Sequence, residues 1–215
     1  MREQTMQRAI LFILILLTTA ALQAQPDAED AIRRLKNGAL IMRLPAYAQK
    51  IAALEEIIAT NNDQSAVRRS KKLLAKTQKE AREENLRIIR SFRKFYNFST
   101  VYFTYDTSIT KLRSGDYLGI FLNDDLSPAP QISLPNGNFL LVHIGYTDPA
   151  TTQRSEALIL TDLSLTQIAA PFPSAIRYNA QSVMLGLNKE STRQKQIKSL
   201  NTRLTRFYNG IESRK

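Results

Sequence analysis

Aspartates end the apolar runs in the middle of this sequence, and carboxylates in such positions can do chemistry. Four predicted strands each finish in one or two of them: Asp106, Asp124 with Asp125, Asp148 and Asp162. Where the carboxyl ends of parallel strands meet, carboxylates can hold a divalent cation or supply a nucleophile for phosphoryl or glycosyl transfer. One hypothesis is therefore a metal-assisted hydrolase built on the strand-end aspartates, with Asp106, Asp124 and Asp125 as candidate metal ligands.

The same aspartates also have an ordinary structural explanation. Aspartate starts turns and caps helices, because its side chain accepts hydrogen bonds from nearby backbone N–H groups. If neighbouring strands are antiparallel, moreover, their ends point to opposite edges of the sheet and the carboxylates never meet. The structural explanation is favoured, and the hydrolase stays open as the alternative. The hydrolase hypothesis requires that four carboxylates lie at one edge of the sheet, and the structural explanation does not. The four are Asp106, Asp124, Asp125 and Asp162.

The single histidine, His143, lies on the same predicted strand face as Phe139 and Leu141, where an imidazole would be half buried. It is a candidate general base or metal ligand. Zinc sites usually need further histidine or cysteine ligands, and the chain has no second His and no Cys. A Ser-His-Asp arrangement lacks the G-x-S-x-G turn that would support it. We therefore interpret His143 as structural, expect no cofactor, and favour a non-enzymatic protein over an enzyme.

The first 24 residues have the layout of a secretory signal peptide. Arg2 and Arg8 precede the apolar run of residues 9–17, and small Ala24 is a suitable last residue before cleavage. The apolar stretch is shorter than the roughly twenty residues that a membrane-spanning helix needs. We predict cleavage between Ala24 and Gln25, export to the periplasm or out of the cell, and no membrane span after cleavage. Without cysteine, the exported protein has no disulfides to stabilise it.

The formal net charge of +11 is unevenly distributed along the chain. Residues 29–95 carry a net charge of +8 and residues 186–215 carry +6, whereas residues 96–185 carry −3. The densest part, residues 68–95, holds eleven Lys or Arg and three Glu within one helical pattern. Basic helical ends therefore flank a mildly acidic middle.

Basic helices of this kind permit several acidic partners. Phosphate contacts by Lys and Arg supply most non-specific affinity for nucleic acid, but export separates the protein from that partner. An anionic surface of the cell envelope, or another envelope protein, is favoured over nucleic acid, because a basic helix can lie on a charged interface. The remaining explanation is a solvated helix, in which Lys76 with Glu80 and Lys79 with Glu83 form pairs four residues apart.

The periodicity of the apolar side chains predicts the elements that would position these residues. Residues 28–95 are predicted to be mainly helical with one short strand, and residues 96–185 to be mainly strands. Residues 188–211 form an amphipathic C-terminal helix. Together they predict a signal peptide, residues 1–24, followed by a single exported domain, residues 25–215. Its class is α/β, with a segregated α+β arrangement left open.

The expected architecture is a mixed sheet of four to six strands, with an N-terminal helical hairpin and the C-terminal helix packed on it. The connection between the first two strands is long enough to cross over, which favours a parallel pair. The short later connections favour antiparallel neighbours. Pro45 is expected to open the first helix of the hairpin, since proline suits the first turn.

Five stretches of the chain carry a resemblance to a family: "NGALIMRL", "FSTVYFTYD", "FLNDDL", "PFPSAIRY" and "LNTRLTRFY". In this order they resemble a set of exported Bacteroidetes proteins with no assigned function. The likeness spans most of the chain that follows the signal peptide. The resemblance implies an exported protein with a single domain, and it names no site residue. Because one His, no Cys and no nucleophile motif provide no complete catalytic constellation, we predict an exported cell-envelope protein that acts as a non-enzymatic binding or assembly module.

Overall fold

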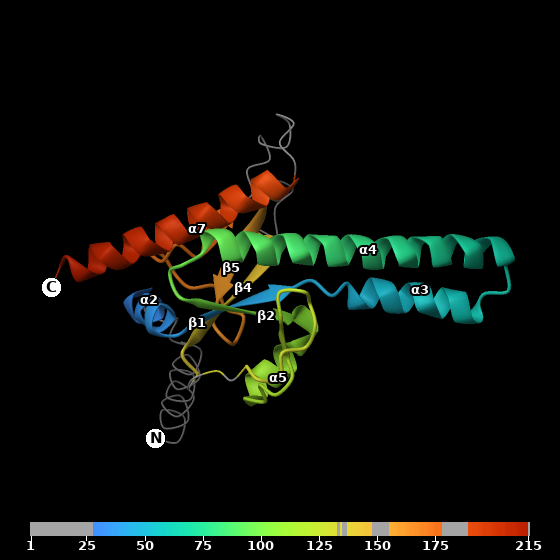
Figure 1. Ribbon diagram of the computed structural model, residues 1–215, viewed down its shortest axis with the longest axis horizontal. Coiled ribbons are helices and arrows are strands. Elements are labelled where there is room, and N and C mark those ends of the chain that lie inside the picture. The colour runs from blue at the N-terminus through green and yellow to red at the C-terminus, as the bar shows by residue number, and fades with distance from the viewer. Residues whose placement is uncertain (1–27, 133, 135–136, 148–154, 178–188, 215) are drawn as a thin grey trace, which may run out of the picture.

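The computed structural model describes residues 28–132, 134, 137–147, 155–177 and 189–214. Within them the chain forms five α-helices, one short 3₁₀-helix and a six-stranded mixed sheet, which is an α/β fold (Figure 1). The predicted fold class is therefore confirmed. The predicted cleavage point between Ala24 and Gln25 lies outside the described residues, and so does Asp148.

The helices alternate with the strands only in the first half of the chain. The helical elements are α2 (Ala28–Asn37), α3 (Ala48–Thr60), α4 (Gln64–Phe95), η1 (Asp106–Ser108), α5 (Ile109–Ser114) and α7 (Lys189–Glu212). The strands are β1 (Ala39–Leu44), β2 (Thr100–Tyr105), β3 (Phe121–Leu122), β4 (Phe139–Tyr146), β5 (Glu156–Thr161) and β6 (Ala175–Arg177). No helix in this part of the chain has both the length and the apolar character to cross a membrane.

The sheet has the strand order β3-β2-β1-β4-β5-β6. The strands β2, β1 and β4 are parallel and lie at its centre, while β3, β5 and β6 join antiparallel at the sides. The predicted parallel first pair is confirmed, since β1 and β2 pair in register from Ala39 with Thr100 to Leu44 with Tyr105. The crossover through α3 and α4 makes this parallel pairing possible.

Alternate residues of β1 enter two different cores. Leu40, Met42 and Leu44 pack with apolar side chains of α2, α4 and α7 on one face. Ala39 and Ile41 pack on the other face with α5 and the segment between β3 and β4. Figure 1 shows α4 and α7 on one side of the sheet and α5 on the other. Because both faces are covered, the central strand is apolar along almost its whole length.

The hairpin of α3 and α4 extends far beyond the sheet (Figure 1). The 32 residues of α4 correspond to a length of about 48 Å at 1.5 Å per residue. Only its C-terminal part reaches the sheet, where Ile88, Ile89 and Phe92 join the core. Nearer the tip, the buried side chains of α4 include the small Ser70 and Thr77, on the part of the helix that runs beside α3. We call residues 48–79 the arm.

The first helix of the arm begins later than the sequence indicates. Pro45 was expected to open it, but α3 starts at Ala48. The reason is a turn between β1 and the helix, in which Tyr47 has a left-handed backbone with a φ of 55°. The backbone N–H of Ala46 donates to Asp106 Oδ1 at 3.1 Å in the same turn. The chain therefore leaves the sheet edge before it becomes helical.

Candidate functional site

The carboxyl ends of the three parallel strands form the first candidate site. After β1 the chain turns to the face covered by α4, whereas after β2 it turns to the face covered by α5. Adjacent parallel strands whose connections leave toward opposite faces create a crevice, and ligands of open α/β sheets bind there. The sheet therefore provides a crevice between the ends of β1 and β2.

Three polar residues from three elements meet at this edge. Arg43 of β1 stands directly beside Thr104 of β2 and His143 of β4 in the register of the sheet. The Arg43 guanidinium donates from Nη2 to the backbone oxygen of Asp106 at 3.3 Å. A cavity of about 110 Å³ opens here, lined by Arg43, Pro45, Asp106, His143 and Ile144. We call this cavity the edge pocket.

The two basic side chains of the edge pocket are partly removed from water. Burial lowers the pKa of His143 below its usual value, and the positive charge of Arg43 lowers it further, so the imidazole is neutral at pH 7. Burial also lowers the pKa of Arg43, an effect that Asp106 opposes and Arg113 reinforces. An arginine nevertheless stays charged at physiological pH. The pocket thus combines a cation with a neutral imidazole.

Because Gly145 has no side chain, the His143 ring has room in its present orientation. A β-carbon at position 145 would lie 3.1 Å from His143 Nε2 and 2.9 Å from Ile159 Cδ1. Both distances are shorter than ordinary contacts between carbon and its neighbours. A side chain at this position would therefore push the imidazole out of its present orientation.

The strand-end aspartates do not meet. Asp106 follows β2 at the carboxyl edge, but Asp124 and Asp125 follow β3, which is antiparallel to β2 and ends at the opposite edge. Asp162 follows β5 and also lies at that opposite edge, because β5 is antiparallel to β4. Four strand spacings separate β3 from β5, roughly 19 Å at 4.8 Å per spacing.

Each of these carboxylates instead has a local structural partner. Asp124 pairs with Arg93 at 2.9 Å. Asp125 accepts hydrogen bonds from the Ser127 hydroxyl and backbone, which lower the pKa of its carboxyl group. Asp162 Oδ1 accepts from the backbone of Thr166 at 2.9 Å and from the Ser164 hydroxyl at 2.7 Å. The contacts of Asp125 and Asp162 are the turn contacts that the sequence offered as the structural explanation, whereas Asp124 forms an ion pair with a residue of α4. Within the described ranges, no three or more His, Asp or Glu side chains gather as metal ligands.

The second candidate site is the cationic surface of the arm. Residues 64–79 of α4 contain six Lys or Arg and no Asp or Glu, and all six cations are exposed. Four of them have no carboxylate within ion-pair distance among the described residues: Arg68, Arg69, Lys71 and Lys72. We call these four the tip cations. Lys76 and Lys79 pair with Glu80 and Glu83 at 3.8 and 3.9 Å, as the spacing predicted.

No protein-family model, no curated protein and no solved structure matches this chain. The two candidate sites are therefore assessed on their geometry and chemistry alone.

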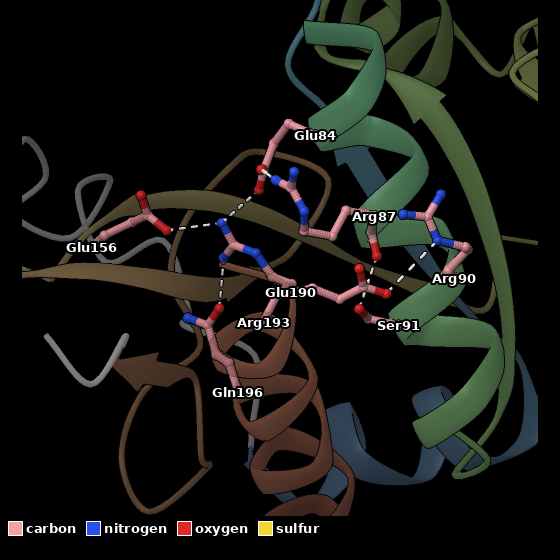
Figure 2. Close-up of polar contacts among 8 residues, drawn as sticks. All are labelled: Glu84, Arg87, Arg90, Ser91, Glu156, Glu190, Arg193 and Gln196. Atoms are coloured by element: carbon pink, nitrogen blue, oxygen red, sulfur yellow. Dashed lines mark hydrogen bonds and ion pairs between the residues drawn. The ribbon is translucent and has the colours of Figure 1, made fainter. Parts of the chain in front are cut away.

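A third polar cluster ties α7 to α4 and β5 (Figure 2). Arg193 is only 4% exposed, and its Nη2 donates to Glu84 at 3.1 Å and to Glu156 at 3.0 Å. Its Nη1 donates to Gln196 Oε1 at 2.6 Å. Figure 2 shows the guanidinium between the two carboxylates, with Arg87 on the far side of Glu84. Because these charges satisfy one another, we interpret this cluster as structural.

The sequence indicated only part of these sites. It placed His143 half buried on a strand face with Phe139 and Leu141, and the structure confirms that position. It did not single out Arg43, although a charged residue inside the otherwise apolar run "ALIMRL" is an available signal. The pairing of Arg193 with Glu84 and Glu156 has no signal in the sequence, since these residues lie on separate elements.

Proposed function

We propose that the protein is an exported binding or assembly protein of the cell envelope, and that its arm binds an anionic lipid surface. One observation carries the proposal: the tip cations lie on a projecting hairpin and have no carboxylate partners among the described residues. The core of the sheet takes no side chain from residues 48–79. The tip cations therefore do not stabilise the packed sheet and the helices that cover it, which we call the body.

The distribution of apolar side chains favours a surface over a groove as the partner. Along most of α3 the partner helix α4 runs beside it, and the large exposed apolar residues of the arm are few: Ile57 and Leu73. A helix that inserts into a membrane interface needs a broad exposed apolar face, which the arm does not offer. Electrostatic attraction to anionic head groups needs only the cations and contributes about 1 kcal/mol for each Lys or Arg near the surface.

The expected strength of this attraction is modest. Four tip cations at about 1 kcal/mol each give about 4 kcal/mol, which corresponds to a dissociation constant in the millimolar range. The attraction should fall with ionic strength, because charges further apart than about 8 Å are screened at physiological salt. Such an arm positions the protein at an anionic surface while the body stays free for another contact.

Vesicle co-sedimentation at low salt tests the proposal. We expect the purified protein to sediment with vesicles that contain phosphatidylglycerol and not with vesicles of phosphatidylcholine alone. Replacing Lys71 and Lys72 by Glu should abolish most of this binding. The matched control replaces Lys195 and Lys198 of α7 by Glu, because both are exposed and the change in net charge is the same. An equal loss in both variants, or no binding to anionic vesicles, would refute the lipid proposal.

The proposal of export has a separate test. The Arg-flanked apolar run that ends near Ala24 supports it, so the form found outside the cytoplasm should begin at Gln25. Mass spectrometry of that form gives its first residue directly. Recovery of intact Met1 in washed membranes would contradict cleavage and would favour an anchored protein.

A further inference from the structure

Two buried nitrogen atoms, in residues that line the edge pocket, have no hydrogen-bond partner among the described residues. They are Nε of Arg43 and Nδ1 of His143, on neighbouring strands in direct register. Buried polar atoms of folded proteins are nearly always hydrogen-bonded, so such atoms need an explanation. Both atoms belong to residues that line one cavity, which makes that cavity a candidate binding site.

The charges around the edge pocket bear on the sign of a ligand. The lining holds one positive charge, on Arg43, and one negative charge, on Asp106, while His143 is neutral and exposed Arg113 lies outside the lining. No carboxylate of the described residues lies within ion-pair distance of Arg43, because the Asp106 carboxylate turns to the N–H of Ala46 instead. Arg113 donates only to the backbone oxygens of residues 163 and 164. Arg43 is therefore a partly buried cation with no carboxylate at ion-pair distance among the described residues, in a lining whose charges cancel.

A partly buried cation without a partner costs free energy, and a bound anion offsets that cost. A metal cation is disfavoured, because Asp106 is the only carboxylate in the lining and Arg43 would repel the ion. The guanidinium offers N–H donors in a planar fork, which fits the oxygens of a carboxylate or phosphate group. His143 lines the same cavity with its ring, while its Nδ1 is buried.

We propose that the edge pocket is a binding site for a small oxyanion, a carboxylate or a phosphate group, with Arg43 as its positive charge and His143 in its wall. The position in the sheet supports this assignment, since the pocket lies where adjacent parallel strands diverge to opposite faces. The site is independent of the arm.

The single histidine makes a direct experiment possible. His143 is the only source of imidazole signals in the untagged protein, so NMR spectra of its ring nitrogens need no assignment. We expect sodium acetate, sodium phosphate, or both to shift these signals in a saturable way at millimolar concentration. Sodium chloride at the same ionic strength should not. A response to acetate alone assigns the carboxylate class, and a response to phosphate alone assigns the phosphate class.

Variants at the pocket complete the test. Arg43→Gln should weaken the affinity for the responding anion at least about tenfold, since it removes the charge and the fork. Arg43→Lys keeps the charge and should lose less, and it serves as the second variant if Arg43→Gln fails to fold. The matched control is Arg177→Gln, an exposed arginine on β6 of the same sheet, which should bind as the wild type does.

Two results would overturn the proposal. One is the absence of a saturable shift with both anions, which would leave the buried nitrogens to ordered water. The other is an equal response in Arg43→Gln and in the wild type, which would place the anion elsewhere on the protein. Isothermal titration calorimetry of the same variants provides a readout that does not depend on the His143 ring.

Discussion

The two ends of α4 belong to one continuous helix with one apolar stripe, yet they differ in almost every contact. In its last dozen residues, Ile88, Ile89 and Phe92 enter the core, and Phe92 contacts the rings of Tyr96 and Phe103 edge-on. At the tip, the helix runs only beside α3. The same spacing of apolar residues along α4 therefore packs one end of the helix into the core and leaves the other end in a projecting arm.

The cations of α4 differ in the same way. Near the body, each of three arginines is held by a carboxylate from a different place: Arg87 by Glu84, Arg90 by Glu190 and Arg93 by Asp124. The tip cations have no such partners among the described residues. Positive charge is thus paired at one end of the helix, through Arg90 and Arg93 with carboxylates of other elements, and is available to a partner at the other end. The comparison explains why a count of Lys and Arg does not reveal their role.

The largest expected effect on stability comes from the end of α4 that packs into the core. Phe92→Ala should lower the free energy of unfolding by about 3–5 kcal/mol, because it leaves a cavity in the core. Leu73→Ala, on the arm, should change it by no more than about 0.5 kcal/mol, since Leu73 is 43% exposed. Urea denaturation measures both. A cost for Leu73→Ala as large as that for Phe92→Ala would mean that the arm is packed against another surface in solution.

A smaller effect is expected where α4 meets α7. Arg193→Ala should cost about 2 kcal/mol, because Glu84 and Glu156 then lose their shared cation. The value is below that of a fully buried pair, since water reaches both carboxylates. Lys195→Ala, an exposed change on the same helix, should be nearly neutral and serves as the control.

A combined variant shows whether the cost of Arg193→Ala arises from the unpaired charges. Adding Glu84→Gln and Glu156→Gln to Arg193→Ala removes the two carboxylates that the arginine would otherwise leave behind. Part of the lost stability should then return in thermal unfolding. If the triple variant is less stable than Arg193→Ala alone, the carboxylates contribute through other contacts and the interpretation of the cluster is wrong.

The smallest effect is expected on the arm itself. Lys79→Ala should cost only a few tenths of a kcal/mol, because its pair with Glu83 is exposed and four residues apart on one helix. A double-mutant cycle with Glu83→Ala isolates the pair, and the coupling should shrink further in high salt. A coupling energy above about 1 kcal/mol would contradict the view that the arm is solvated.

The sequence predicted the elements well because their signals are local. The apolar period identified "ALIMRL" as a buried strand and placed His143 on a strand face with Phe139 and Leu141. It also predicted the pairs of Lys76 with Glu80 and of Lys79 with Glu83, which need only one helical turn. The sequence did not predict the start of α3 correctly. The turn before this helix depends on the contact of Ala46 with Asp106, which joins the ends of two different strands.

The directions of the strands determine whether the strand-end aspartates meet, and these directions are a property of the tertiary structure. Each aspartate follows a strand in the sequence, but β3 and β5 run against β2 and β4, so Asp124 and Asp162 end at the edge opposite Asp106. The parallel register of β1 with β4 brought Arg43 beside His143 instead.

By itself, the sequence determined the compositional and local properties of this protein: a chain without cysteine, a net charge of +11, and the periods that make its helices and strands. The tertiary structure alone decided which charges from different elements meet. Glu190 of α7 pairs with Arg90 and Asp124 after β3 pairs with Arg93, whereas the tip cations project with α4 past the edge of the sheet. The physical reason is that periodicity depends on neighbours within one or two helical turns, whereas ion pairs and pockets depend on distances between elements that only packing fixes.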